Sequence, residues 1–357
     1  RRRSKERKDR GREKMKLITF AVPCYNSEEY LSRCMESLLS AGTDCEIILI
    51  DDGSTDNTGI IADRYETEYP NIVKAVHKEN GGHGSGVNKG LELATGLYYK
   101  VVDSDDWLDK EALKTLTDRI KRDIKEKKLP DVYIADFVYE KVSTGDRYER
   151  SFRKNFPKKD LFTWEEVKRF HVSSVLLMHA LVYRTEKLKE SKTVLPEHTF
   201  YVDNIFAYKP LPYMEKLSYM EIPLYRYYIG RNDQSVSAEN ITKRYLQQIR
   251  VMKELIKAYT YREITLFPKG LRRYMLHDLA VVMTLTVTFT SAGKDNVKRR
   301  KTELKGLWEY IKERDKKLYS YLKYHTYTSI VNWLPFKLQG KATWLGYKFF
   351  RKKLKCS

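Results

Sequence analysis

Three short apolar segments of this chain end abruptly in polar or acidic residues. Residues 17–22 run into a Pro-Cys-Tyr-Asn turn, residues 46–50 run into two aspartates, and residues 97–102 run into a cluster of aspartates. Each apolar run has the composition of a buried strand, and helix-like sequence follows each turn. This alternation predicts an α/β fold with a mainly parallel sheet flanked by helices. Ligands of such sheets bind beyond the carboxyl ends of the strands, so we expect the polar turns to converge on one crevice.

The acidic turn after residues 97–102 contains Asp103, Asp105 and Asp106. Asp103 and Asp105 are two residues apart, so an extended backbone points both side chains to the same side. Carboxylate oxygens suit a hard divalent cation, which can in turn bridge a diphosphate. An acidic turn without a ligand is the alternative, because acidic residues are common after strands.

Four segments together resemble the family 2 glycosyltransferases of the GT-A fold. They occur in the order and at about the spacing of that family: residues 22–26 (VPCYN), 51–56 (DDGSTD), 80–90 (NGGHGSGVNKG) and 103–106 (DSDD). The resemblance is strong over residues 15–110 and weaker over residues 111–237. It implies a GT-A (Rossmann-like) catalytic domain over residues 15–237.

The resemblance also implies roles for the acidic turn. Asp105 would be the direct ligand of a divalent metal, either Mn²⁺ or Mg²⁺, because carboxylate and phosphate oxygens are hard ligands. Asp103 would lie beside the metal and contact the ribose of the donor. Asp106 is expected near the donor or acceptor sugar. The metal would stabilise the departing diphosphate as a Lewis acid.

The nucleotide is expected at the first two strand ends and at the glycine-rich loop. The resemblance implies that the backbone of residues 23–25 and Asp52 border the base; Asp51 could serve equally, and one of the two acids could instead cap the next helix. Glycines at residues 81–86 let the backbone approach a ligand closely. Arg231 could pair with the diphosphate or be a surface arginine. The predicted nucleotide-binding residues are Pro23, Tyr25, Asp51, Asp52, Gly82, Asn88, Lys89, Asp103 and Arg231.

An inverting transfer needs a base that removes the proton from the acceptor hydroxyl, a role that carboxylates or histidines usually take. Residues 200–206 (FYVDNIF) resemble the acidic motif of the family, although Val202 replaces its usual glutamate. Asp203 then occupies the position of the base; a helix-capping aspartate is the alternative. We predict that His83 is a turn residue, and that His179 and His198 are structural.

The same patterns place the other elements. Residues 140–160 indicate a hairpin or a mobile loop, and Thr163–Glu166 indicates a capping box that opens a helix. Apolar residues at three- and four-residue spacing predict a helical C-terminal region over residues 238–332. Strands are predicted near residues 16–22, 46–50, 72–76, 97–102 and 132–139, and helices over residues 27–41, 56–69, 84–95 and 109–127.

The net charge of +20 is concentrated near the two ends of the chain. Residues 1–14 carry a net charge of +6 and residues 337–357 a net charge of +7. We predict a basic disordered extension over residues 1–14 and a basic, aromatic, amphipathic tail over residues 333–357. Such a tail suits an anionic membrane interface, although a packed helix with its lysines facing solvent is the alternative. No nucleic-acid-binding motif is present, so no nucleic-acid partner is expected.

We expect a cytoplasmic protein that is peripheral on the inner face of the cell membrane. The N-terminal residues are charged and lack the apolar core of a secretory signal. The longest apolar stretch, residues 279–289, is interrupted by threonines and too short to span a bilayer. The cysteines show no metal-ligand spacing and are expected to be reduced thiols.

The sequence therefore predicts an inverting, metal-dependent glycosyltransferase. It would move a sugar from a nucleotide-diphosphate donor, expected to be a UDP-sugar, to a hydroxyl of a lipid-linked or cell-envelope saccharide. One alternative is a nucleotidyltransferase acting on a sugar phosphate, which would usually carry a glycine-rich, basic loop where residues 23–26 stand. The other is a non-enzymatic basic membrane-binding protein, which would need no aligned carboxylates.

Overall fold

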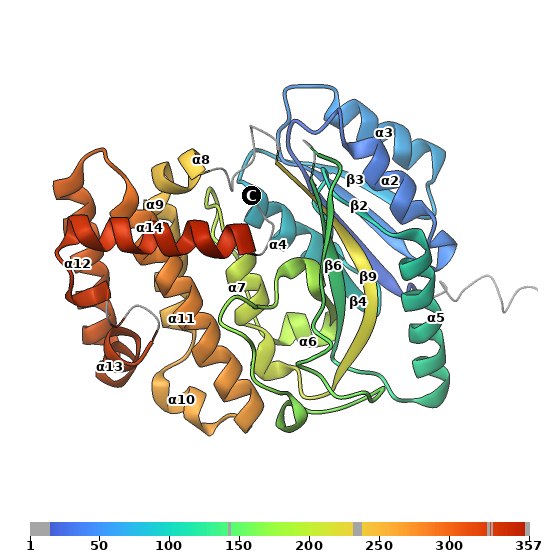
Figure 1. The fold of residues 1–357 in the computed structure, drawn as a ribbon. Helices are drawn as coiled ribbons and strands as arrows, with labels where there is room; N and C mark the ends of the chain where they lie inside the picture. The colour runs from blue at the N-terminus through green and yellow to red at the C-terminus, as the bar shows by residue number, and fades with distance from the viewer. Residues whose placement is uncertain (1–14, 142–143, 231–237, 327–328, 330, 354–357) are drawn as a thin grey trace, which may run out of the picture.

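The computed structural model describes residues 15–141, 144–230, 238–326, 329 and 331–353. These residues form an α/β lobe and a helical lobe that lie side by side (Figure 1). The predicted extension, residues 1–14, lies outside the described residues, as does Arg231. The predicted boundary at residue 237 also falls in a segment that is not described, and the predicted tail is described only up to residue 353.

The α/β lobe is built on one mixed sheet. Within the described residues its strand order is β3-β2-β1-β4-β8-β6-β9-β5, and β7 pairs with β6. The first four strands in this order are parallel to one another, which is the part that the sequence predicts. Beyond β4 the sheet is mixed, because β8 is antiparallel to both β4 and β6 and β9 runs parallel to β6. The strands are β1 (Ile18–Cys24), β2 (Glu46–Asp51), β3 (Val73–His77), β4 (Tyr98–Val101), β5 (Trp107–Leu108), β6 (Val132–Lys141), β7 (Arg147–Arg150), β8 (Leu181–Arg184) and β9 (Leu217–Ile229).

Burial explains why the central strands consist of continuous apolar runs. All seven residues of β1 and all four of β4 are buried, as expected for strands that are covered on both faces. The predicted strands and helices of the first half are present, with ends displaced by up to four residues. The helices of this lobe are α2 (Leu31–Leu39), α3 (Thr58–Glu68), α4 (His83–Leu93), α5 (Lys110–Glu126), α6 (Thr185–Glu190) and α7 (Asp203–Tyr208).

Two smaller predictions are confirmed in modified form. Residues 140–160 contain a hairpin, because β7 pairs antiparallel with the end of β6. The capping box at Thr163 and Glu166 is present, but it opens only a single 3₁₀ turn, Trp164–Glu166. Cys24, Cys34 and Cys45 are buried free thiols, as expected.

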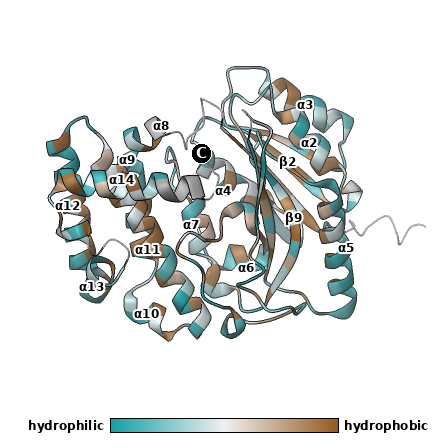
Figure 2. Cartoon of the chain, viewed as in Figure 1, coloured by the Kyte–Doolittle hydropathy of each residue, from teal (hydrophilic) through white to brown (hydrophobic). Residues whose placement is uncertain are grey.

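The predicted helical C-terminal region is confirmed. Its central helix is α11, which packs against α9, α12 and α14. Apolar residues gather on the strands and on α11 (Figure 2). The region consists of α8 (Ala238–Lys243), α9 (Tyr245–Ala258), α10 (Tyr261–Leu266), α11 (Lys269–Ala292), α12 (Val297–Arg314), α13 (Lys316–Tyr324), the 3₁₀ turn η5 (Val331–Trp333) and α14 (Phe336–Lys353).

Helix α11 is longer and more apolar as a unit than residues 279–289 suggest. An 18-residue window has a mean hydropathy of 1.3, so by length and composition alone the helix could cross a membrane. However, 67% of that window is buried against the rest of the protein, which is also what the core helix of a globular lobe shows. Its threonines donate hydrogen bonds to backbone carbonyls one turn earlier, which satisfies their hydroxyls within the helix.

Two helical glycines should respond in opposite ways to replacement by alanine. A Cβ on Gly90 would lie 2.5 Å from the Cβ of Ala21 and 2.9 Å from the hydroxyl of Tyr99, because α4 packs closely on β1 and β4. A Cβ on Gly306, inside α12, would meet nothing within 4 Å. We predict that Gly90→Ala destabilises the protein by about 1–3 kcal/mol through overpacking. Gly306→Ala should stabilise it by about 0.5–1 kcal/mol, because alanine favours the helix.

Urea unfolding followed by circular dichroism measures both effects. Equal shifts of the unfolding midpoint for the two variants would contradict this packing of α4 on the sheet.

Candidate active site

Several of the predicted site residues that the structure describes gather at the carboxyl ends of the parallel strands. Asp51 ends β2, and the turn of residues 103–106 follows β4. Helix α4 begins at His83, so only Gly81 and Gly82 of the predicted glycine-rich loop precede it, whereas Gly84 and Gly86 lie inside the helix. The segment that leads into α7 meets this loop, since the backbone N–H of His198 donates a hydrogen bond of 2.7 Å to the carbonyl of Gly81.

Asp103 lies beside two histidines, of which His83 is hydrogen-bonded to it. Its Oδ1 lies 2.8 Å from Nε2 of His83, and its Oδ2 lies 3.6 Å from Nε2 of His179. Its backbone N–H donates to the hydroxyl of Tyr225 at 3.1 Å. Burial would raise the pKa of Asp103, but the two imidazoles outweigh burial and hold this pKa well below its usual range. Asp103 is therefore an anion that is balanced locally by imidazole groups.

Asp106 lies deeper than Asp103, with 1% of its surface exposed. One carboxylate oxygen accepts a 2.7 Å hydrogen bond from the hydroxyl of Tyr225, and the other accepts one of 2.7 Å from the backbone N–H of Tyr228. Burial raises the pKa of Asp106 well above its usual value, and the negative charges of Asp105 and Asp103 add to this effect. A cation in this cluster would relieve the repulsion among the carboxylates.

His179 is a buried histidine whose ring nitrogens could serve as metal ligands. It is buried in the 3₁₀ turn Met178–Ala180, stacks on Tyr227 with the ring centroids 4.3 Å apart, and meets the ring of Tyr225 at 4.6 Å. Among the described residues, neither of its ring nitrogens has a hydrogen-bond partner. One ligand atom each from Asp103, Asp106 and His179 can be chosen so that all lie within 4.8 Å of one another. Two carboxylates and an imidazole fit Mn²⁺, and the carboxylates fit Mg²⁺ as well.

Asp105 is half-buried beside this cluster. Its backbone carbonyl is bound by the side chain of Arg33. The guanidinium of Arg33 donates to the Asp105 carbonyl at 3.1 Å. It also lies over the rings of Trp107 and Tyr228, at 3.9 and 4.3 Å from their centroids. Such a stacked arginine loses little freedom when it binds the turn. The structure thus brings together the three aspartates predicted for metal and sugar, while the role of Asp105 as direct ligand stays a prediction.

Asp52 shapes the glycine-rich loop. Its carboxylate accepts hydrogen bonds from the backbone N–H of Gly81 at 2.9 Å and of Gly82 at 2.7 Å. It also pairs with Nζ of Lys78 at 2.6 Å. Gly82 has φ +81°, and a Cβ there would lie 3.2 Å from the backbone nitrogen of His198, so glycine is required. Asp52 therefore lies at the predicted nucleotide site and already holds its loop in place.

Asp51 holds the neighbouring strand end. Its carboxylate accepts the backbone N–H of Ser54 at 3.0 Å and lies 3.0 Å from Nδ1 of His77. Burial would raise the pKa of Asp51, but these hydrogen bonds outweigh burial and lower it. Asp51 therefore caps the turn that follows β2, and it does not cap helix α3.

The remaining predicted nucleotide residues differ in their surroundings. Pro23 lies on β1 and faces Gly86, where a Cβ would approach it to 2.9 Å. Tyr25 is 53% exposed directly after β1. Asn88 exchanges hydrogen bonds with the backbone of Leu195, at 2.9 and 3.0 Å, and so holds the segment before α7. Lys89 pairs with Glu92 at 2.8 Å on the surface of α4.

Asp203 begins α7 and belongs to the same electrostatic cluster. Burial raises its pKa; the charges of His179 and His83 oppose this increase, whereas Asp103 adds to it. The preceding residue, Val202, is 2% exposed and packs in the core, which explains why an apolar residue stands where the family usually has glutamate. Tyr201, with φ +64°, holds the turn before α7 in a left-handed conformation that is costly for a tyrosine.

Two histidines of the cluster are not identified by the sequence prediction. His83 was predicted to be a turn residue and His179 a structural one, yet both lie against Asp103. His83 stands between Gly82 and Gly84 of the glycine-rich segment, and that position is a usable signal. His179 shows no comparable signal in the sequence.

Comparisons with known proteins show which sequences this chain resembles. The sequence profile of Glycosyl transferase family 2 matches residues 19–189. The glycosyltransferase GlyG of Streptococcus pneumoniae is 38% identical over 134 residues, which are 37% of this chain and 42% of GlyG. The putative glycosyltransferase EpsH of Bacillus subtilis is 28% identical over 229 residues, which are 59% of this chain and 60% of EpsH. The chain thus matches less than two thirds of the length of either relative.

A solved structure with the same fold is S. aureus TarS 1–349 in complex with UDP-GlcNAc. The two chains superpose with a TM-score of 0.63 at 20% sequence identity. The aligned region covers 93% of this chain and 92% of the TarS chain. The likeness confirms the predicted GT-A fold with its helical C-terminal region.

The bridge made by His77 gives a pH-dependent prediction. Hydrogen bonds to Asp51 and to Asp63, at 3.0 and 2.8 Å, raise the pKa of His77. A raised pKa of a histidine in the folded state means that its contribution to stability is complete below about pH 6.5 and is lost as the pH rises through the folded value. The lowered pKa of Asp51 acts oppositely, so its contribution is lost only as the pH falls below about 4.

We therefore expect the melting temperature of wild type to exceed that of His77→Gln by more at about pH 6 than at about pH 9. Thermal unfolding across this range measures the difference. The matched control is His325→Gln, because His325 contacts a backbone carbonyl rather than a carboxylate, and its difference from wild type should stay flat. A larger gap at the alkaline end for His77→Gln would contradict the bridge.

Proposed function

We propose that the chain is an inverting, metal-dependent glycosyltransferase, and the match of residues 19–189 to the profile of Glycosyl transferase family 2 supports this. It would transfer a sugar from a nucleotide-diphosphate donor, which we take to be a UDP-sugar, to a hydroxyl of a saccharide acceptor. The observation that carries the proposal is the cluster of Asp103, Asp106 and His179, whose ligand atoms lie within 4.8 Å of one another at the strand ends. Asp105 lies in the same turn.

Donor binding is assigned to the strand ends and the glycine-rich loop. Asp52 holds Gly81 and Gly82 in a fixed turn, so the loop is preorganised to approach a nucleotide. Asp103 and Asp105 would hold Mn²⁺ or Mg²⁺, with Asp106 and His179 close by. When bound, such a metal would supply Lewis-acid stabilisation of the departing diphosphate. The UDP-GlcNAc bound to TarS supports the choice of a UDP-sugar as the first donor to be tested.

Proton removal is assigned to Asp203. A carboxylate that acts as a base near neutral pH benefits from a raised pKa, and burial raises the pKa of this group. The imidazoles of His83 and His179 oppose this increase and so favour the ionised form that a base requires. The carboxylate would accept the proton of the acceptor hydroxyl as that oxygen attacks the sugar carbon opposite the diphosphate.

The place of action is proposed to be the inner face of the cell membrane, with a lipid-linked or cell-envelope saccharide as acceptor. The basic and aromatic composition of residues 333–357 supports this location. A nucleotidyltransferase fits less well, because Pro23-Cys24-Tyr25-Asn26 stands where that class usually carries a basic, glycine-rich loop.

Asp105→Ala should abolish the metal-dependent part of nucleotide binding. Wild type is expected to melt at a higher temperature with UDP and Mn²⁺ together than with UDP alone, because a ligand that binds only the folded state stabilises it. Asp105→Ala should lose that increment and its turnover, whereas Asp118→Ala, on the exposed face of α5, should keep both. An undiminished Mn²⁺-dependent increment in Asp105→Ala would refute the metal assignment.

Asp203→Asn should separate chemistry from binding. Loss of a general base typically lowers kcat by about 10²–10⁴-fold, while the melting increment with UDP and Mn²⁺ should persist. Release of UDP in the presence of acceptor measures kcat, and Asp118→Asn serves as the control for removing a carboxylate. A kcat within twofold of wild type would remove Asp203 from the role of base.

A further inference from the structure

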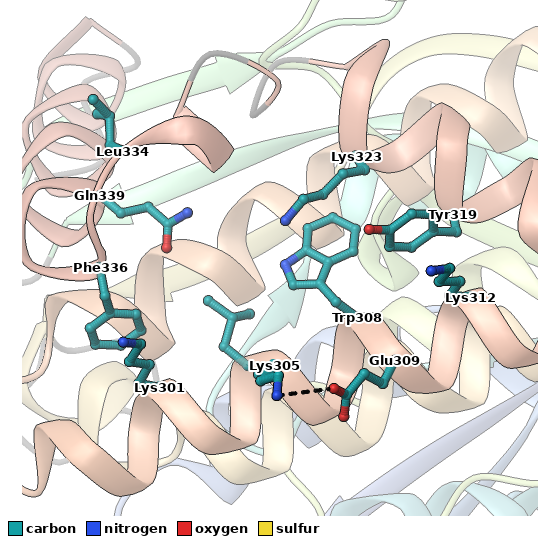
Figure 3. Close-up of a pocket in the computed structure, with 11 residues that line it drawn as sticks. Lys301, Lys305, Trp308, Glu309, Lys312, Tyr319, Lys323, Leu334, Phe336 and Gln339 are labelled. Atoms are coloured by element: carbon teal, nitrogen blue, oxygen red, sulfur yellow. Dashed lines mark ion pairs between the residues drawn. The ribbon is translucent and has the colours of Figure 1, made fainter.

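The helical lobe contains a cavity of about 390 Å³ between α12, α13 and the start of α14 (Figure 3). We call it the lysine pocket and define it by six of its lining residues: Lys301, Lys305, Lys312, Lys323, Trp308 and Phe336. Among the described residues, Glu309 is the one acidic residue that lines it, and it pairs with Lys305 at 3.4 Å. The lining therefore carries an excess of three positive charges around an aromatic floor.

Aromatic rings hold two of the ammonium groups. Nζ of Lys323 lies 4.4 Å from the centroid of Trp308, and Nζ of Lys312 lies 5.9 Å from that of Tyr319. Trp308 is 7% exposed and lines the inner side of the pocket. Burial lowers the pKa of Lys323, because partial removal from water disfavours its charged form. A bound anion would offset that cost and the mutual repulsion of the lysines.

An apolar ridge continues from the pocket along α14. It consists of Trp333, Leu334, Leu338 and Leu345, which are 76%, 36%, 49% and 71% exposed. Leu334 also lines the lysine pocket, so the ridge begins at the pocket, whereas Leu338 and Leu345 lie on the side of α14 opposite the lining residue Gln339. These four side chains fall within 13 consecutive residues, and apolar side chains that gather on a surface often mark a contact with a protein or a membrane.

The packing of α14 fixes which side of the helix is exposed. Gln339, Gly340 and Thr343 are buried, and a Cβ on Gly340 would collide with the carbonyl of Ser291 in α11. Leu338 and Leu345 are two turns apart on the opposite side, and Lys341 and Lys348 follow them at three-residue spacing, also exposed. Alternating leucines and lysines on one helix face suit the interface of an anionic membrane.

We propose that the lysine pocket binds the phosphate headgroup of an anionic phospholipid, and that the apolar ridge enters the membrane interface beside it. This inference deepens the membrane location given under the proposed function and rests on it. The charge of the pocket is complementary to a phosphodiester, and the ridge distinguishes a lipid from a free phosphate, which would leave the four apolar side chains in water.

The position of α14 connects this surface to the candidate active site. The ring of Tyr347 in α14 meets that of Phe289 in α11 at 5.7 Å, and Phe289 meets Tyr201 at 6.3 Å. Tyr201 stands two residues before Asp203. The buried face of α14 is therefore linked, through α11, to the segment that carries the proposed base.

Cosedimentation of the full chain with vesicles tests the pocket. Wild type should bind phosphatidylcholine vesicles that contain about one third phosphatidylglycerol, and bind pure phosphatidylcholine much more weakly. The double variant Lys301→Gln/Lys312→Gln should lose roughly 20-fold in affinity, since each basic residue near an anionic leaflet contributes about fivefold. The matched control is Lys298→Gln/Lys316→Gln, which removes two exposed lysines of α12 and α13 outside the pocket and should change affinity less than twofold.

Equal losses in the two double variants would mean general charge attraction and overturn the pocket. Leu338→Gln/Leu345→Gln should also lose vesicle binding; if it instead only dissociates a dimer in sedimentation velocity, the ridge is a contact between copies of the chain and the proposal fails. Inorganic phosphate that raises the melting temperature without any vesicle binding by wild type would likewise overturn the lipid assignment. All variants should keep the melting increment with UDP and Mn²⁺, so failure here is distinguishable from failure of the proposed function.

Discussion

The balance of charge at the end of β4 is the constraint on which the rest of the site depends. Three aspartates stand in four residues of one turn, and one of them, Asp106, is almost fully withdrawn from water. The fold offsets this cost with the imidazoles of His83 and His179 and with the hydroxyl of Tyr225, which serves both Asp106 and the backbone of Asp103. Burial also lowers the pKa of the nearby Lys100 to about 7, so this lysine balances the carboxylates less than an exposed lysine would. The remaining negative potential is what makes the turn suitable for a divalent cation.

The helical lobe positions the segment that carries the proposed base, Asp203. From α9, Gln247 accepts the backbone N–H of Phe200 at 2.8 Å, and Arg250 donates to the side chain of Thr199 at 2.8 Å. These bonds, with the ring contact between Tyr201 and Phe289, hold a turn that is conformationally strained. Donor residues thus come from the sheet, while the acceptor side depends on packing between the two lobes.

Much of the donor side could be predicted from the sequence because it is local. Strands that end in polar turns place Asp52, Gly82 and Asp103 at one edge of a parallel sheet whatever the rest of the chain does. The partners that come from distant segments could not be predicted in this way. His179 reaches Asp103 only because β8 inserts antiparallel beside β4, and nothing in the sequence around residue 179 specifies that pairing. The lysine pocket is similar: the lysines of α12 are visible as a helical stripe, but the packing of α13 and α14 that closes the pocket is not.

The most direct test of the central claim is the location of a metal ion in crystals grown with UDP and Mn²⁺, by anomalous diffraction at the manganese edge. The account predicts one strong peak in the turn of residues 103–106, within about 2.1 Å of a carboxylate oxygen and in contact with a diphosphate oxygen. UDP bound at the ends of β1 and β2 with manganese located elsewhere, or with no manganese at this turn, would contradict it.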